Sequence, residues 1–322
     1  MVAPDSFKGT LSARQVANAI ARGLKRAGAR ADLCPAADGG EGTMDVLVEA
    51  LGGERRAASA LDPLGREIEV EYGLLRDGTT AVVDVAAASG LTLVLPEERN
   101  PEAASSAGTG DLIAAAIEAG ATRVLVAAGG SATTDGGDGA IRALEAAGGM
   151  HGARLEVLCD TTVPFEHAAE VFAPQKGAGP EQVERLTSRL VALAGALPRD
   201  PRGRTMTGAA GGLSGGLWAT FGARLIPGAA TVLGMLGFDR LLEDADAVIT
   251  GEGRFDRQSL EGKLTGEIAR RCRRAQVPLH VIAGDVAIAV GPERGVTSYV
   301  EAGEPDEIVA AAEAIALGPP GR

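Results

Sequence analysis

The stretch from residue 247 to residue 263 constrains the fold of this chain more than any other. An apolar run over 247–249 is followed at once by Gly251-Glu252-Gly253, and then by Arg254, Asp256, Gln258, Ser259 and Lys263. We expect a strand that ends in a glycine turn, because open α/β sheets build their sites from turns at the carboxyl ends of strands. Glycine lets backbone N–H groups approach a ligand closely. The charged side chains can neutralise phosphate, hold a metal ion or accept a proton.

Three further stretches share this design, in which a short apolar segment leads into a polar glycine turn and then into a helical pattern. They cover 3–10, 35–43 and 129–137 and contain Asp5, Ser6 and Lys8, then Asp38 and Glu41, then Gly130, Ser131, Thr133, Thr134 and Asp135. The third can form a nest of N–H donors at a helix N-terminus. Its composition fits equally well an ordinary loop that needs glycine for its backbone. Asp135 can be a helix N-cap or a magnesium ligand.

The first two stretches follow neighbouring strands of one predicted β-α-β-α unit, so both are expected at the same edge of a parallel sheet. A lysine such as Lys8 is usually a solvated surface residue. At this edge it can instead bind a carboxylate or phosphate, with Asp5 or Asp38 beside it. Lys8 and Asp38 are therefore candidate site residues.

Two other stretches contain residues whose function is less evident. Gln175-Lys176 lies in an irregular segment after Pro174, where a lone lysine usually faces solvent. In 208–216, the pairs Gly211-Gly212 and Gly215-Gly216 are spaced four apart. That spacing slightly favours a close contact between backbones over a loop that binds phosphate or nucleotide.

Composition and charge exclude several classes of partner. Aromatic residues make up 3% of the chain and the net charge is −12, which disfavours binding to nucleic acid or to an anionic membrane surface. No apolar run approaches the roughly 18 residues of a membrane span, and no secretory signal precedes the first strand. We therefore expect a cytoplasmic protein. Cys34, Cys159 and Cys272 lie far apart, which indicates free thiols.

The order of the predicted elements indicates two α/β domains. Strands and helices alternate up to about residue 55, an antiparallel meander follows and ends in 81–85, and βα alternation resumes near residue 240. A length of 322 residues is comfortable for two domains. We predict a Rossmann-like parallel-sheet domain built from 1–60 plus 240–322. An α/β domain with a mixed sheet, 61–239, is inserted into it.

In this order, the stretches 3–10, 35–43, 129–137, 172–178, 208–216 and 247–263 resemble the bacterial glycerate kinases of the glycerate and glucarate catabolism type. The resemblance extends from the first residues to about Asp285. It implies two α/β domains and ATP-dependent phosphorylation of D-glycerate, with 2-phosphoglycerate favoured over 3-phosphoglycerate as product. ATP and Mg²⁺ are the implied cofactors, and a homodimer is possible. The sequence has no G-x-x-x-x-G-K-[ST] motif, so the ATP site must be built without a P-loop.

The resemblance and the residue pattern together assign candidate roles. The catalytic candidates are Lys8, Asp38 and Asp256; those for the nucleotide are Gly130, Ser131, Thr133, Thr134, Gly211, Gly212, Gly251, Gly253 and Lys263; those for the substrate are Asp5, Ser6, Arg254, Gln175 and Lys176; and Asp135 is the metal candidate. Phosphoryl transfer needs positioning, neutralised charge and a carboxylate to accept the alcohol proton, and these residue types supply all three.

Two alternative functions stay open. The segment 162–167 departs from the family pattern, in which an asparagine and a glycine-rich stretch usually follow the Cys-Asp pair at 159–160. This departure motivates a non-catalytic sensor of small hydroxy acids that retains the fold. The other alternative is a kinase for a related sugar acid.

Overall fold

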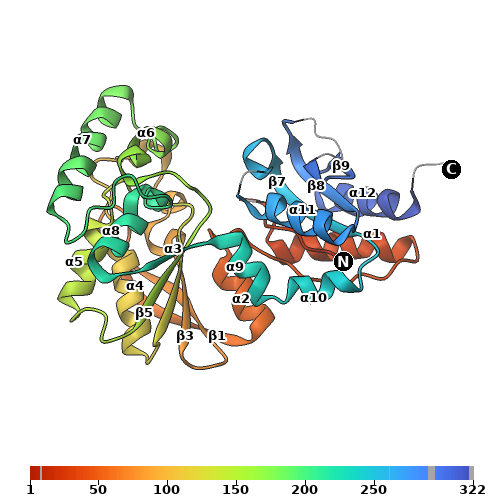
Figure 1. Ribbon diagram of the computed structural model, residues 1–322, viewed down its shortest axis with the longest axis horizontal. Helices are drawn as coiled ribbons and strands as arrows, with labels where there is room; N and C mark the ends of the chain where they lie inside the picture. The colour runs from red at the N-terminus through yellow and green to blue at the C-terminus, as the bar shows by residue number, and fades with distance from the viewer. Residues whose placement is uncertain (8, 261, 289–293, 319–322) are drawn as a thin grey trace. The chain divides into compact units, whose positions relative to one another are not determined.

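The computed structural model describes residues 1–7, 9–260, 262–288 and 294–318 (Figure 1). The chain forms two compact units, of which unit 1 comprises Met1–Asp38 and Ala229–Arg322 and unit 2 comprises Gly39–Gly228. Each unit has its own sheet and helices, and the expected α/β class with one parallel and one mixed sheet is confirmed. The three cysteines are buried free thiols.

The unit boundaries differ from the expected positions near 60 and 240. Helix α2 (Thr43–Leu51) packs on β2 (Glu67–Leu75), and β1 (Gly53–Leu61) pairs with β2 along its whole length. Both elements therefore belong with the mixed sheet. The sequence placed them in the other domain because α2 continues the early βα alternation.

The sheet of unit 2 has the strand order β1-β2-β3-β4-β5-β6. The remaining strands are β3 (Thr80–Asp84), β4 (Arg123–Ala127), β5 (Arg154–Cys159) and β6 (Arg224–Pro227). Strands β1, β2 and β3 are antiparallel, as the meander pattern predicts, whereas β3 to β6 are parallel. The carboxyl ends of these four parallel strands therefore lie at one edge of the sheet.

Helices cover both faces of this sheet. The helices of unit 2 other than α2 are α3 (Val85–Ser89), α4 (Ala107–Glu118), α5 (Asp138–Ala146), α6 (Ala168–Phe172), α7 (Pro180–Ala196) and α8 (Leu213–Phe221). Helices α4, α5 and α8 bury their apolar side chains against one face, in a core that includes Leu112, Leu144 and Leu217. Helix α2 packs on the opposite face, where Gly73 of β2 leaves room for the side chains of Met44 and Val48.

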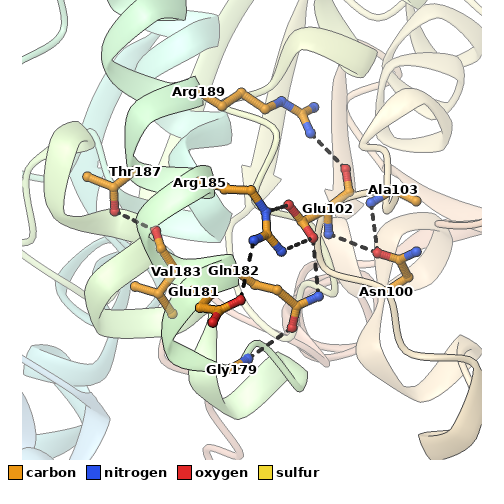
Figure 2. Close-up of polar contacts among 10 residues, drawn as sticks. All are labelled: Asn100, Glu102, Ala103, Gly179, Glu181, Gln182, Val183, Arg185, Thr187 and Arg189. Atoms are coloured by element: carbon orange, nitrogen blue, oxygen red, sulfur yellow. Dashed lines mark hydrogen bonds and ion pairs between the residues drawn. The ribbon is translucent and has the colours of Figure 1, made fainter.

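Helix α7 is attached to the loop before α4 by a polar network (Figure 2). The Arg185 guanidinium donates to both carboxylate oxygens of Glu102, at 2.8 and 3.0 Å. The amide of Gln182 donates to the same carboxylate, and Arg189 donates to the Glu102 carbonyl. Helices α6 and α7 also share a small apolar core around Phe165, Leu186 and Leu190. The network holds α7, and the short η4 turn (Pro174–Lys176) before it, on the rest of unit 2.

The sheet of unit 1 is parallel. It contains β7 (Val248–Phe255), β8 (Leu279–Val286) and β9 (Ser298–Glu301), and Val2 forms parallel bridges to Ile249 of β7 and to Leu33. The extended segments around Val2 and Leu33 correspond to the two strands expected early in the chain. The spatial order is therefore the Leu33 segment, the Val2 segment, β7, β8 and β9.

Alternating side chains of this sheet enter two different cores. Val248 and Val281 face one core together with the helices α9 (Gly228–Met235), α10 (Phe238–Glu243) and α11 (Leu264–Ala275). Ile249 and Ile282, one position later, face the other core with α1 (Ala13–Arg26) and α12 (Pro305–Leu317). A strand buried on both faces reads as a continuous apolar run, as in parallel sheets generally. Figure 1 shows α1 and α12 side by side, in red and blue. Helix α1 starts with a capping box formed by Ser12 and Gln15.

Candidate active site

The strand order of unit 1 creates a topological switch point between the Val2 segment and β7. The chain leaves the Val2 segment through α1 towards Leu33 on one side, whereas β7 lies on the other side. Ligands of open α/β sheets bind where the connections diverge in this way, outside the carboxyl ends of the strands. Asp5 lies at this point, because its N–H donates to the Gly251 carbonyl at 2.8 Å. Its largely buried carboxylate accepts the Ser6 N–H at 2.7 Å.

Strand β7 does not end at the predicted glycine turn. Gly251 pairs with Ile282 and Arg254 pairs with Asp285, so the strand continues to Phe255. A β-carbon on Gly251 would lie 3.0 Å from the Ile282 carbonyl oxygen and 3.3 Å from the Phe7 ring. Gly251 therefore serves a close approach of backbone and side chains within the sheet, which is a usual role of glycine inside a strand. The expected turn at 251–253 was wrong.

Glu252 is a site residue that the sequence analysis did not select. Its Oε2 accepts the Ser259 hydroxyl at 2.6 Å, while its buried Oε1 has no hydrogen-bond partner among the described residues. Burial raises the pKa of Glu252, and the hydrogen bond from Ser259, the nearby Thr265 hydroxyl and the charge of Lys263 oppose this rise. Lys263 occupies the N-cap position of α11. The sequence shows Glu252 between Gly251 and Gly253, but nothing in it distinguishes this acid from the other charged residues of the stretch.

Asp256 and Arg254 lie just beyond this carboxylate. The Asp256 Oδ1 accepts the N–H groups of Gln258 and Ser259, at 2.8 and 3.3 Å, and so forms the η6 turn (Gln258–Leu260). Arg254 is exposed and lies 3.6 Å from Asp256 and 3.5 Å from Asp285. These bonds favour a turn-forming role for Asp256, whose catalytic role remains a prediction. Asp38 is buried after the Leu33 segment, and Lys8 lies outside the described residues.

In unit 2, the loop after β4 carries several predicted residues to the carboxyl edge of the sheet. Ser131, Thr133 and Thr134 are all buried, and the hydroxyls of Thr133 and Thr134 have no hydrogen-bond partner in the described part of the chain. An unpaired buried hydroxyl costs about 1–3 kcal/mol, so it calls for a ligand or a water molecule. The loop is therefore a candidate site, and Gly130 at its start is exposed.

Asp135 is fully engaged inside the protein. One carboxylate oxygen accepts the Ser106 N–H at 2.9 Å, the Ser106 hydroxyl at 2.8 Å and the Gly139 N–H at 3.2 Å. The other accepts the Gly137 N–H at 3.1 Å. A carboxylate bound by four donors has little capacity left for a metal ion. This geometry favours the capping role of Asp135 over the metal role, which remains a prediction.

Lys176 joins the same loop from η4. Its ammonium group donates to the Ser131 hydroxyl at 3.0 Å and to the Thr133 carbonyl at 2.5 Å. Burial lowers the pKa of Lys176 to about 7, and the charge of Asp135 opposes this shift. The neighbouring Gln175 is exposed. The structure thus brings together Lys176, predicted for the substrate, and Ser131 and Thr133, predicted for the nucleotide.

The glycine-rich stretch 208–216 packs behind this loop. Gly211 and Gly212 have left-handed backbones, with φ of 67° and 90°, and a β-carbon on Gly211 would lie 2.0 Å from the Thr133 carbonyl oxygen. A β-carbon on Gly216 would likewise lie 2.2 Å from the Gly136 carbonyl oxygen. These contacts are the close approach of backbones that the spacing of the two Gly-Gly pairs slightly favoured over a phosphate-binding loop. The nucleotide role of Gly211 and Gly212 remains a prediction.

A second residue that the sequence analysis did not select, Asp84, ends strand β3. Its two carboxylate oxygens accept the N–H groups of Gly42 and Met44, at 2.7 and 3.0 Å. Burial raises the pKa of Asp84 to about 7, although both hydrogen bonds favour the ionised form. Asp84 thereby anchors the loop 39–43 beside the loop after β4, where a β-carbon on Gly129 would lie 2.6 Å from the Gly40 Cα. Its position as an acid at the end of a predicted strand is the sequence signal that could have identified Asp84 as a site residue.

The divergent segment 162–167 has a packing role. Phe165 is completely buried, its N–H donates to the Thr207 hydroxyl at 2.9 Å, and its ring lies against Gly212 and Gly215. The Val163 carbonyl accepts the Gly208 N–H. The segment therefore supports the glycine-rich stretch behind the loop after β4.

In the described ranges, no cluster of three or more His, Cys, Asp or Glu side chains could hold a metal ion. No helix within the described part of the chain is long and apolar enough to cross a membrane.

Comparison with known proteins identifies the family. The model of the glycerate kinase family matches residues 1–149 and 145–314. A glycerate kinase of Halalkalibacterium halodurans is 39% identical over 89% of this chain and 85% of its own length. The glycerate 2-kinase of Escherichia coli is 37% identical over 90% of this chain and 86% of its own. The crystal structure of a Salmonella typhimurium LT2 protein, provisionally named glycerate kinase 2, is 35% identical with a TM-score of 0.82, over 98% of this chain and 96% of that one. The chain therefore belongs to the glycerate kinase family.

Proposed function

We propose that this protein catalyses ATP-dependent phosphorylation of D-glycerate and that the product is 2-phosphoglycerate. Family membership supports the reaction class, and the similarity to a glycerate 2-kinase supports the choice of product. The observation that carries the proposal is the contact of buried Lys176 with Ser131 and Thr133 at the carboxyl end of β4. Phosphoryl transfer depends on such fixed positive charge, because charge accumulates on the transferred group. ATP supplies the phosphoryl group when bound.

The loops at the carboxyl edge of the unit 2 sheet are our candidate for the nucleotide phosphate site. The unpaired hydroxyls of Thr133 and Thr134, the Lys176 ammonium and the close glycine contacts at Gly129 fit a compact anionic group. Asp84 serves this site by holding the loop 39–43 in place. Gly130, Gly211, Gly212, Gly251, Gly253 and Lys263 remain candidates from the sequence.

For the proton of the glycerate hydroxyl we favour Glu252 as acceptor. A general base needs a free oxygen lone pair and a pKa moved towards the working pH. Glu252 has a buried oxygen without a partner in the described part of the chain and a raised pKa. Asp38 stays the alternative base from the sequence analysis. Asp5, Ser6, Arg254 and Gln175 stay substrate candidates.

Mg²⁺ accompanies ATP in this proposal. In kinases it is typically held by one or two carboxylates together with substrate phosphates and waters. Asp135 stays the metal candidate from the sequence, although its oxygens already accept four hydrogen bonds. We further propose a cytoplasmic location, where ATP is available. The possible homodimer stays a prediction.

The proposal is tested by incubating the purified protein with MgATP and D-glycerate and identifying the product by ³¹P and ¹³C NMR. We expect stoichiometric 2-phosphoglycerate and ADP. Exclusive 3-phosphoglycerate would correct the regiochemistry. Phosphorylation of sugar acids in preference to glycerate would favour the second alternative. Binding of glycerate without turnover would favour the sensor, although the packing role of 162–167 now accounts for the divergence that motivated it.

A further inference from the structure

The surroundings of Lys176 are unusual for a lysine. The residue is only 3% exposed, and its ammonium group donates two hydrogen bonds, both to neutral oxygens, the Ser131 hydroxyl and the Thr133 carbonyl. An ammonium group has three donors, so one N–H has no acceptor among the described residues. Moving a charge out of water is costly unless the charge is paired and fully hydrogen-bonded.

No carboxylate of the described ranges forms an ion pair with Lys176. The charged group that acts on it electrostatically is Asp135, from the loop after β4. The carboxylate of Asp135 is occupied by Ser106, Gly137 and Gly139. Arg99, whose stem lies beside Gly177, is a further charged side chain near η4, and the Glu41 carboxylate approaches Gly130 of the loop after β4. Arg99 carries the same sign of charge and cannot neutralise Lys176.

We propose that the ammonium group of Lys176 is a counter-ion for a nucleotide phosphate group, which binds beside the loop 129–135. The inference deepens the proposed function and rests on it. The sequence analysis assigned Lys176 to substrate binding, whereas this inference assigns it to nucleotide binding. The unpaired hydroxyls of Thr133 and Thr134 on the same loop provide a second observation that points to a ligand at this place.

A physical consequence follows from the burial of Lys176. Without ligand, burial lowers the pKa of Lys176 to about 7, so at pH 8 the side chain is mostly neutral. A phosphate dianion beside the amine favours the charged form and raises the pKa again. At pH 8 the phosphates of MgATP are already fully ionised, since their last pKa lies near 6. Binding of MgATP at pH 8 must therefore take up a proton from solution, close to one for each site.

The uptake is measured by isothermal titration of the whole wild-type protein with MgATP at pH 8, in two buffers that differ in ionisation enthalpy. We expect uptake approaching about one proton per nucleotide at pH 8 and much less at pH 6, where Lys176 is already charged. This measurement needs no variant. Binding of MgATP without proton uptake at pH 8, or no binding of MgATP at all, would overturn the proposal.

A variant of Lys176 provides a second test of the proposal. Lys176→Met keeps most of the buried stem and removes the charge, so we expect the affinity for MgATP to fall at least tenfold and the proton uptake to disappear. Lys25→Met, which removes an exposed lysine of α1, is the matched control and should behave like wild type. Circular dichroism melts establish that each variant is folded. Wild-type affinity in a folded Lys176→Met protein would sink the proposal.

The same titrations with D-glycerate alone distinguish the two anions of the reaction. Proton uptake and loss of affinity confined to glycerate would assign Lys176 to the substrate carboxylate and overturn the proposal. The outcome is also separable from the proposed function. If the protein phosphorylates glycerate but MgATP binding neither takes up a proton nor depends on Lys176, the proposed function stands and this inference is rejected. If MgATP binding takes up a proton and depends on Lys176 but glycerate is not phosphorylated, the inference stands and the proposed function is rejected.

Discussion

Asp84 and Lys176 illustrate at the residue scale how burial tunes the edge of the unit 2 sheet. Burial moves the pKa values of both towards 7, upwards for the acid and downwards for the base, because it disfavours whichever form is charged. Neither residue has an ion-pair partner among the described residues. Perturbed groups of this kind cluster at functional sites. They also make the folded state respond to pH near neutrality.

We predict that Asp84 makes the protein less stable as the pH rises from about 4 to about 7. Its pKa is about 7 in the folded state against 3.8 in the unfolded chain. In this window the folded state therefore binds more protons, and the free energy of unfolding falls with rising pH. Asp84→Asn cannot titrate, so the stability of wild type minus that of Asp84→Asn should be larger at pH 5 than at pH 8. Urea unfolding at both values measures the gap.

Activity gives an independent check on Asp84. A carboxylate accepts the N–H groups of both Gly42 and Met44, whereas an amide offers one acceptor and turns its NH₂ group towards the other donor. The loop 39–43 should therefore shift, and kcat/KM should fall by about tenfold or more in Asp84→Asn. A gap that is constant with pH, together with unchanged kcat/KM, would mean that Asp84 does not anchor the loop as described.

A second prediction separates two neighbouring acids. Glu252→Gln keeps the acceptor for the Ser259 hydroxyl but removes the basic oxygen, so kcat should fall by roughly 10²–10⁴ with little change in melting temperature. Asp256→Asn should change kcat by less than about tenfold, because its carboxylate forms the η6 turn. Stopped assays at saturating substrate measure both variants. The reverse order of effects would return the base role to Asp256, as the sequence predicted.

At the element scale, the glycines of 208–216 show how backbone packing shapes the site. They allow this stretch to lie directly against the loop 133–137, which carries Thr133 and Thr134. Gly211→Ala places a β-carbon at 2.0 Å from the Thr133 carbonyl oxygen on a backbone with a φ of 67°. The strained backbone alone costs about 1–2 kcal/mol, and the contact must push the loop aside. We expect a loss of more than about 2 kcal/mol in the free energy of unfolding and a loss of nucleotide binding.

Gly195→Ala in α7 is the matched control for this prediction. A β-carbon there meets no atom within 4 Å. Alanine is the better helix former by about 0.8–1.0 kcal/mol in exposed helix interiors, so this variant should be slightly more stable than wild type. Guanidinium unfolding compares the two. If Gly211→Ala were as stable as Gly195→Ala, the packing of 208–216 against the loop would be looser than the structure describes.

Elements with a regular pattern were predictable from the sequence, and the remainder depended on tertiary contacts. The antiparallel meander expected up to 81–85 corresponds to β1, β2 and β3. Strand β7 was predicted too short, because its last residues are polar and are held in the strand only by pairing with β8. Strand β6 was not predicted, since Arg224–Pro227 is short and its residues do not alternate between apolar and polar.

Among site residues, Ser131 and Thr133 were selected from a glycine-rich loop. Asp84 was missed because its partners, Gly42 and Met44, come from a distant part of the sequence. Glu252 was missed because its unpaired buried oxygen depends on packing that the sequence does not show.

At the scale of the whole molecule, chain topology decides which residues can share a site. In unit 1, Val2 lies between Leu33 and Ile249, so pairing brings together parts of the chain almost 250 residues apart. In unit 2, the four parallel strands β3 to β6 align the loops that follow them at one edge. Both arrangements place polar loops where open α/β sheets bind ligands. They require local cations, because the molecule as a whole carries a net charge of −12.

The net charge makes a prediction about partners. Non-specific binding to DNA depends on neutralising phosphates with lysine and arginine, and affinity falls steeply with salt. This chain has 31 basic residues against 43 acidic ones, so its average field repels a polyanion. We expect no shift of a labelled duplex in a gel at protein concentrations up to tens of micromolar and 150 mM salt. We also expect no binding at 20 mM salt, where screening is weaker and the repulsion reaches further. MgATP, in contrast, is small enough to reach a single buried cation such as Lys176. A salt-sensitive shift at micromolar protein would contradict this reasoning, because it would require a basic surface large enough to outweigh the net charge.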